Sequence, residues 1–147
     1  MKRFLILVLI TFSFIISGCG DITAPPDATI EIKPDRVTQK GLAGPICQPF
    51  TIVVKNKDGI GIRDVIVYIS GSLAAPRDPA RYYFYKNTNC EEPYVDSNFS
   101  ITTEDYGVAY FAISIPAEVK GAPNTFTDTI EVRSGTLYTS ASVEVTE

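Results

Sequence analysis

Short segments in which apolar and polar residues alternate make up most of the chain, and this pattern limits the fold more than any other feature. Residues 108–115 (VAYFAISI) show it clearly, because Ala109, Phe111, Ile113 and Ile115 fall on one side of an extended chain. Successive side chains of a strand point to opposite faces, so alternation gives a strand one buried and one wet face. The pattern therefore predicts β-strands in an antiparallel arrangement.

Seven or eight such segments follow one another after Ala28, and turns rich in Gly, Asp and Asn separate them. They are residues 29–33, 50–55, 64–70, 82–85, 98–102, 108–115, 127–133 and 137–145. No stretch after Ala28 has apolar residues at helical spacing over the length of a helix. Short strands at this spacing predict an all-β fold, a single antiparallel β-sandwich of seven to eight strands.

The N-terminus predicts export from the cell. Lys2 and Arg3 precede an apolar run over residues 4–16 that only Thr11 and Ser13 interrupt. The run is shorter than the roughly 20 residues that a membrane-spanning helix needs. A basic start, a short apolar run and small residues after it are typical of a cleaved secretory signal peptide.

The end of this segment, Ile16-Ser17-Gly18-Cys19, resembles the lipobox of bacterial lipoprotein precursors. The resemblance implies cleavage after Gly18 and lipid, palmitate included, on Cys19. The membrane would then hold the protein through this lipid in the bacterial cell envelope, on the outer-membrane or periplasmic side or at the cell surface. The alternative is an ordinary signal peptide followed by an unrelated cysteine.

The expected organisation is a signal peptide over residues 1–18, a lipidated cysteine and tether over 19–27, and one domain over 28–147. The polar, proline-bearing stretch GDITAPPD at 20–27 suits a tether. Without residues 1–18 the chain keeps 11 basic and 17 acidic side chains, a net charge of −6. An acidic chain without a Lys/Arg cluster is a poor binder of phosphate backbones, so we expect no nucleic-acid partner.

Cys47 and Cys90 remain if Cys19 carries lipid, and an exported protein meets oxidising conditions. A disulfide between them would enclose 42 residues. Closing such a loop stabilises a fold by roughly 4 kcal/mol in the chain-entropy model. The alternative is a pair of free, buried thiols.

The complete absence of histidine excludes several kinds of catalytic and metal site. No Ser-His-Asp triad, imidazole base or His-ligated metal can form, and two cysteines cannot build a four-thiolate zinc site. A hydrolase would depend on converging carboxylates with perturbed pKa values. We expect no enzyme, no cofactor and no metal.

Two segments resemble the bacterial Ig-like domains of the invasin/intimin type. Residues 56–69 (NKDGIGIRDVIVYI) resemble the hairpin pattern D-G-x-P-v-x-G-v-x-V-x-f of that family. Residues 102–111 (TTEDYGVAYF) are similar to its T-d-x-x-G-x-A-x-f pattern, and the segments 128–132 and 141–145 fit its last two strands. The resemblance implies an Ig-like sandwich over 28–147 with a spacer or adhesive role.

Four residues of these segments are expected to form turns. Gly59 and Gly107 supply the positive φ that tight turns need. Asp58 and Asp105 can accept hydrogen bonds from amides just downstream of themselves. The chain departs from the family pattern at Ile60 and Ile62, where proline or another turn residue is common.

A long connection over residues 70–97 also departs from the pattern, and it holds the candidate contact residues. Aromatic and arginine side chains are enriched where proteins bind one another. The candidates are Arg77, Arg81, Tyr82, Tyr83, Tyr85 and Tyr94. The alternative is that every second aromatic residue covers the core and the others form ordinary strand surface.

These observations predict a non-catalytic, lipid-anchored envelope protein. Its expected role is a structural module, a cell-adhesion module or an accessory subunit of a surface assembly, with a protein partner in the envelope or at the surface. The alternative is a carbohydrate- or small-ligand-binding module that uses the region Tyr82–Tyr85. The absence of Trp makes a glycan partner the weaker expectation.

Overall fold

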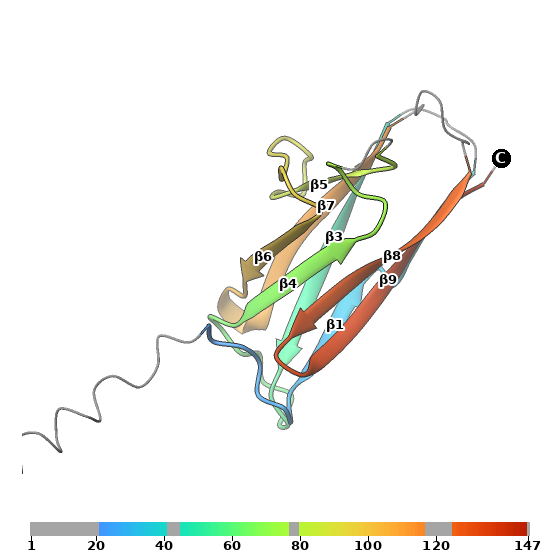
Figure 1. The fold of residues 1–147 in the computed structure, drawn as a ribbon. Coiled ribbons are helices and arrows are strands. Elements are labelled where there is room, and N and C mark those ends of the chain that lie inside the picture. Colours follow the sequence, from blue (N-terminus) through green and yellow to red (C-terminus); the bar gives the residue numbers. More distant parts are fainter. Residues whose placement is uncertain (1–20, 41–44, 77–79, 117–124, 147) are drawn as a thin grey trace, which may run out of the picture.

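Two β-sheets pack face to face in the computed structural model, which describes residues 21–40, 45–76, 80–116 and 125–146 (Figure 1). The first sheet contains, in spatial order, β1 (Thr29–Lys33), β3 (Ile46–Lys55), β7 (Val108–Ile115) and β5 (Tyr83–Tyr85). The second contains β2 (Arg36–Lys40), β9 (Leu137–Thr146), β8 (Phe126–Ser134), β4 (Ile66–Gly71) and β6 (Asn98–Thr102). A 3-10 turn, η1 (Asp105–Gly107), precedes β7.

The predicted all-β, Ig-like sandwich is confirmed, with nine strands in the described residues in place of seven or eight. The additional strand is β2, which runs parallel to β9, whereas every other strand pair in the two sheets is antiparallel. Sequence alternation missed β2 because its two buried positions are Val37 and the polar Gln39. A single apolar residue gives no visible alternation.

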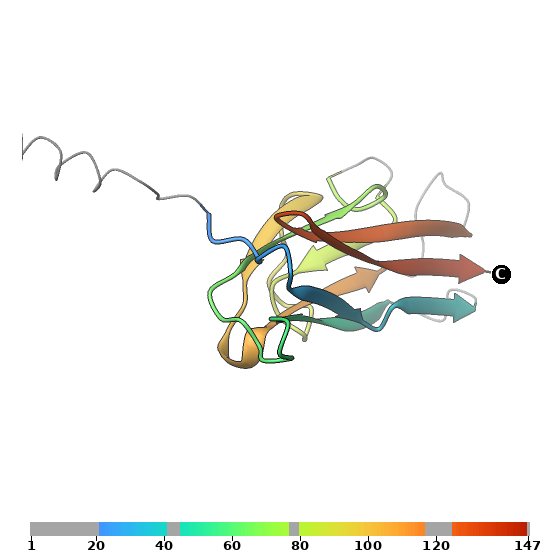
Figure 2. The ribbon, with the colours of Figure 1, turned by 90° about the horizontal axis from the view of Figure 1, so that it is seen from below.

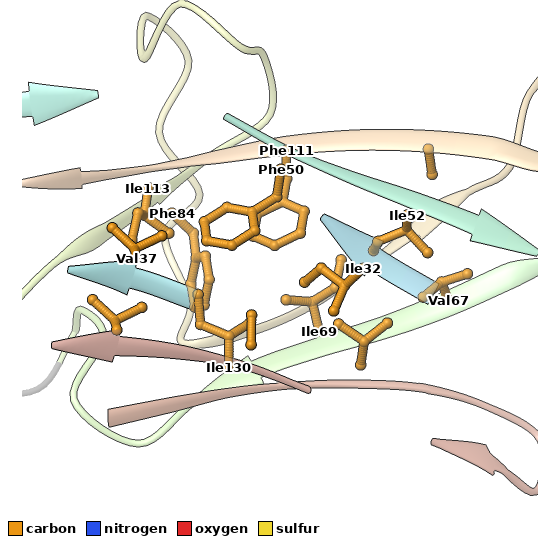
Figure 3. Packing of buried hydrophobic residues seen from close by; sticks show 14 of the residues in the cluster. Ile32, Val37, Phe50, Ile52, Val67, Ile69, Phe84, Phe111, Ile113 and Ile130 are labelled. Carbon is orange, nitrogen blue, oxygen red and sulfur yellow. The ribbon is translucent and has the colours of Figure 1, made fainter. Parts of the chain in front are cut away.

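The core between the sheets forms from the inward side of each alternating strand. Phe50 of β3 lies directly opposite Phe111 of β7, and their rings stack with centroids 5.0 Å apart (Figure 3). Both side chains are fully buried. Ile69 and Ile130 of the second sheet lie below this pair in the same cluster. A stacked aromatic pair contributes about 1 kcal/mol beyond the area that it buries.

The connections between strands lie at the two ends of the sandwich. The end formed by residues 21–28, 56–65, 103–107 and 134–136 is called the N-terminal end. At the opposite end lie residues 72–76, 80–82 and 86–97, together with the end of β9. Both views show the N-terminal end and the C-terminus on opposite sides of the molecule (Figures 1 and 2).

The chain is bound to the sandwich from Asp21 onward, whereas the sequence predicted a tether over 19–27. The Ile66 amide donates to the Ile22 carbonyl at 2.7 Å, and the Ala24 amide donates to Ser134 Oγ at 2.9 Å. Ser134 Oγ in turn donates to the Ile66 carbonyl at 2.6 Å. The described part of the predicted tether therefore belongs to the folded domain.

The two segments that resemble Ig-like domains meet at the N-terminal end. A Cβ at Gly61 would lie 1.9 Å from the Tyr106 carbonyl oxygen, so the two backbones touch. Thr103 Oγ1 donates to the Ile62 carbonyl at 2.8 Å and accepts from the Val65 amide at 3.0 Å. Residues 56–69 and 102–111 thus form one packed unit.

The turns in this unit confirm the predicted glycines and correct the predicted aspartates. Gly59 and Gly107 have φ of +80° and +71°. The side chain that holds the first turn is Asn56, whose Oδ1 accepts from the amides of Asp58 and Ile60. Asn56 precedes the turn and can reach these amides, which is the geometry that favours Asn at this place.

Asp105 also has a different partner from the one predicted. Its carboxylate accepts from Arg63 Nη1 at 2.9 Å and so joins the two segments. Both side chains are largely exposed. The ion pair therefore contributes less than about 1 kcal/mol.

Gly61→Ala should lower the free energy of unfolding by about 3 kcal/mol, because the new methyl group meets backbone atoms that cannot rotate away. The matched variant is Gly59→Ala, where a Cβ meets nothing within 4 Å and only the positive φ is costly. It should lose about 1 kcal/mol. Urea unfolding of both variants measures the difference, and equal losses would contradict the close contact.

Candidate functional site

The aromatic residues of β5 and its N-terminal neighbour alternate between the core and the surface. Tyr82 and Phe84 are buried, at 0% and 1% exposure, while Tyr83 is 41% exposed and Tyr85 is half-buried. The prediction that Tyr82 contacts a partner is therefore wrong, because a strand places every second side chain inward. Arg77 lies outside the described residues.

Tyr82 belongs to a buried polar cluster around Asp128 of β8. The Tyr82 hydroxyl donates to Asp128 Oδ2 at 2.7 Å, and Ser72 Oγ donates to Oδ1 at 2.6 Å. The Leu73 amide donates to Oδ2 at 2.7 Å. Burial, followed by the hydrogen bond to Asp128, raises the pKa of Tyr82 far above its usual value. This cluster ties the β4–β5 connection to the second sheet.

Gly71 makes room for this cluster. A Cβ on Gly71 would lie 2.0 Å from the Tyr82 hydroxyl oxygen. The phenol therefore crosses β4 at the one place where that strand has no side chain. The sequence singled out Tyr82 but did not show that its ring passes over Gly71.

The predicted disulfide between Cys47 and Cys90 is confirmed, with the two Cα atoms 5.9 Å apart. Cys47 lies on the outer face of β3, where its neighbour across the sheet is Ser114 of β7. The bond therefore holds the loop 86–97 against the first sheet. The Tyr94 amide of the same loop donates to the Phe84 carbonyl of β5, and within the loop the Lys86 amide donates to the Glu92 carbonyl.

Tyr94, one of the predicted contact residues, packs on the core side of this loop, whereas Tyr83 and Tyr85 lie on the outward side of β5. Tyr94 stacks on Phe99 with ring centroids 3.7 Å apart, and burial raises the pKa of Tyr94. Lys86 Nζ lies 5.6 Å from the centroid of the Tyr94 ring. We call the β5 surface the group formed by Tyr83, Tyr85, Lys86 and the 82% exposed Val95.

Arg81 lies apart from the β5 surface, over a different element. Its guanidinium carbon is 5.9 Å from the centroid of the Phe126 ring, at the start of β8. The Phe126 ring also stacks on Tyr82, with centroids 6.4 Å apart. Arg81 thus covers the aromatic cluster from outside.

A row of side chains that the sequence did not suggest crosses the outer face of the second sheet. Tyr68 of β4 pairs in register with Arg133 of β8, and Arg133 pairs with Tyr138 of β9. The Arg133 guanidinium lies 5.3 Å from the Tyr138 ring centroid and donates to Glu131 at 2.9 Å. We call this group the Tyr68–Tyr138 row.

A shallow depression of about 520 Å³ adjoins the row. Its lining residues are Tyr68, Ile69, Ser70, Asn98, Phe99, Ser100, Glu131 and Arg133. The Tyr68 hydroxyl donates to the Asp21 carboxylate at 2.5 Å, and this hydrogen bond raises the pKa of Tyr68. Outward polar residues on each strand were visible in the sequence, but the register that joins them was not.

A second depression of about 530 Å³ on this sheet has both Asp128 and Glu131 among its lining residues. Asp128 points into the core and Glu131 points outward, because they occupy opposite faces of β8. Within the described ranges, no group of three or more His, Cys, Asp or Glu side chains could hold a metal ion. The same ranges contain no helix with the length and apolar character to cross a membrane.

No protein-family model and no curated protein matches the chain. Among solved structures, domains 4 and 5 of the S-layer protein SbsC match with a TM-score of 0.46 and 13% identity, over 81% of this chain and 51% of that one. A family 123 glycoside hydrolase from Clostridium perfringens matches with a TM-score of 0.42 and 13% identity, over 82% and 27%. The periplasmic chaperone SfaE matches with a TM-score of 0.37 and 8% identity, over 80% and 57%. The chain thus spans little more than half of each structure or less, and likenesses this remote carry no argument about its activity.

Tyr82→Phe should lower the free energy of unfolding by about 2 kcal/mol near neutral pH, because a buried carboxylate loses a donor. The wild type should also lose stability above about pH 10, since the unfolded chain releases the Tyr82 proton there and the folded chain retains it. Above this pH, the free energy of unfolding of the wild type should fall more steeply with pH than that of the variant, by about 1.4 kcal/mol per pH unit. Urea unfolding at pH 8 and pH 11 measures both effects.

The matched variant is Tyr83→Phe, which changes the same atom at the exposed neighbouring position. It should leave the stability near neutral pH unchanged. A loss as large as that of Tyr82→Phe would show that the buried hydrogen bond to Asp128 is not the cause.

Proposed function

We propose that this chain is a lipid-anchored, non-catalytic protein of the bacterial cell envelope. Its Ig-like domain, with the likeness to invasin/intimin-type domains, serves as a structural or adhesive module or as an accessory subunit of a surface assembly. Membrane attachment is through lipid on Cys19 after removal of residues 1–18. The partner is a protein in the envelope or at the surface.

The observation that carries the proposal is that Asp21 and Ile22 already contact the folded domain. Asp21 already accepts a hydrogen bond from Tyr68, and Ile22 already accepts one from Ile66. These two contacts with the domain lie two and three residues after Cys19, where a lipidated mature protein would begin. The disulfide Cys47–Cys90 also suits an exported protein, because such bonds persist in oxidising compartments.

The two ends of the sandwich suit an anchor at one end and a contact at the other. Residues 21–24 lie at the N-terminal end, and the β5 surface lies toward the opposite end (Figure 1). The β5 surface combines exposed Tyr and Val side chains with one Lys on a loop that the disulfide restrains. Rigid aromatic side chains of this kind bind partners at a low cost in conformational entropy.

The state of the buried carboxylate supports a role without catalysis. Asp128 is the one buried acidic side chain of the described ranges. It accepts three hydrogen bonds, from Ser72, Leu73 and Tyr82. Its hydrogen bonds hold the chain together. Three donors take up most of the roughly four acceptor positions of a carboxylate.

Cys19→Ser should move the protein from the membrane fraction to the soluble fraction and remove the acyl mass from the N-terminal peptide. The wild-type protein should show that mass on Cys19 and no residues before it. Fractionation and mass spectrometry of the purified protein measure both. A wild-type N-terminus without lipid would contradict the proposal.

Mild crosslinking of the same membrane-extracted protein should capture a stoichiometric protein partner. Tyr83→Ala should weaken this capture, because Tyr83 is the exposed aromatic residue of β5. Tyr110→Ala is the matched variant, since Tyr110 is 46% exposed on the same sheet but lies outside the β5 surface. Capture that Tyr83→Ala leaves intact would place the contact elsewhere on the domain.

The Tyr68–Tyr138 row favours a second candidate function, carbohydrate binding. Sugar rings stack on exposed aromatic side chains and form hydrogen bonds with polar groups beside them. Tyr68 and Tyr138 are 43% and 52% exposed, and Arg133, Glu131 and Ser100 lie next to them. As a candidate carbohydrate site, this face replaces the predicted region Tyr82–Tyr85, because Tyr82 and Phe84 are buried in the core.

Binding to an array of bacterial and plant polysaccharides tests this candidate. Tyr138→Ala should abolish any binding that the row provides, and Tyr110→Ala should retain it. Binding that survives Tyr138→Ala would exclude the row as the site.

A further inference from the structure

The N-terminal end presents three exposed apolar or aromatic side chains. Ile22 is 61% exposed, Ile60 is 64% exposed and Tyr106 is 87% exposed. Ile60 and Tyr106 are neighbours, because a Cβ at Gly61 would touch the Tyr106 backbone. Ile22 belongs to the segment that is bound beside Ile66.

The chain between the lipid and the fold is too short to separate them. Asp21 is fixed by Tyr68, and Cys19 lies two residues before it. Two extended residues span about 7 Å. Lipid on Cys19 would therefore keep the N-terminal end of the sandwich beside the lipid headgroups.

We propose that this end lies in the headgroup region of the bilayer, with Ile60, Tyr106 and Ile22 as its contacts. This inference rests on the lipid anchor proposed above. The domain then stands on the membrane in a defined orientation. The β5 surface and the C-terminus face away from the bilayer.

The turn that carries Tyr106 supports this role. Tyr106 has φ of +63°, a left-handed conformation that is rare for a large side chain. The Gly107 amide donates to the Glu104 carbonyl, and the Glu104 amide donates to the Val108 carbonyl, so the turn is pinned on both sides. Strained residues that their surroundings hold in place concentrate at functional sites. At this turn the strained conformation leaves the Tyr106 ring exposed to solvent. Tyr is enriched at membrane–water interfaces.

The contact does not need high affinity. A short linker gives the linked group an effective concentration in the millimolar range. Side chains that would bind a bilayer only weakly from solution are then bound most of the time. The anchor retains the protein, and the three side chains set how the domain is oriented.

Charge indicates which lipids suit this surface. The acidic residues at this end are Asp21, Asp27, Asp58, Asp64, Glu104 and Asp105, and the basic ones are Lys57 and Arg63. Arg63 is paired with Asp64 and Asp105. An acidic surface is repelled by anionic lipids, and salt screens the repulsion. The proposal is therefore contact with a zwitterionic phospholipid surface.

The test uses the full lipidated protein in phosphatidylcholine vesicles, with a polarity-sensitive fluorophore on a single introduced cysteine. Ile60→Cys and Tyr106→Cys place the label at the N-terminal end. Val95→Cys is the matched variant at the opposite end, where Val95 is 82% exposed. Acylated Cys19 and the bonded Cys47–Cys90 pair leave the introduced thiol as the one that reacts.

We expect blue-shifted emission and several-fold weaker quenching by acrylamide at positions 60 and 106, with no change at 95, relative to the protein in dilute detergent. Anionic lipid at low salt should reduce these shifts, and added salt should restore them. The inference would be overturned if acrylamide quenched the labels at positions 60 and 106 as strongly as the label at position 95. Equal protection at all three positions would overturn it too.

Intact mass of the same samples separates this result from the proposed function. Acyl mass on Cys19 together with open labels at 60 and 106 refutes the oriented contact and leaves the lipid anchor in place. Absence of acyl mass refutes both. The circular dichroism of each variant confirms that the labelled protein is folded.

Discussion

The Asp128 carboxylate is the interaction on which the packing of the two sheets most depends. A buried charge is costly unless it is fully hydrogen-bonded, so its three donors must all be in place at once. Ser72 and Leu73 belong to the connection after β4, and Tyr82 is the residue just before β5. Asp128 thereby fixes the crossing of the chain from the second sheet to the first. The position of β5, the disulfide loop and the β5 surface all follow from that crossing.

The sequence was sufficient for the fold wherever strands alternate, and insufficient where polar residues replace apolar ones. Residues 108–115 and 127–133 identified β7 and β8 because each has several inward apolar side chains. β2 was missed because Gln39 occupies a buried position, and the parallel pairing with β9 has no local signature. Residues 21–27 were taken as a tether because they are polar, whereas backbone groups of Ile22 and Ala24 bind the sandwich.

The candidate site was predictable in part for the same physical reasons. Pairing of Cys47 with Cys90 followed from their number and the expected compartment, and proximity in the fold confirms it. Alternation alone could have placed Tyr82 inward, since Phe84 shares its face and is also buried. Arg133 and Tyr138 belong to the β8–β9 hairpin, whereas Tyr68 comes from β4, much earlier in the sequence. Their common row depends on a register that only the assembled sheet defines.

The parallel pair β2–β9 has a mechanical consequence. β2 follows β1 and lies beside the last residues of β9, toward the pole of the domain that carries the C-terminus (Figure 2). Tension between the two termini would pull these strands lengthwise past one another. All of their hydrogen bonds would then have to rupture together, in shear, in contrast to a hairpin that unzips one bond at a time. The five paired positions of β2 and β9 would therefore share a load that is applied between the two ends of the domain.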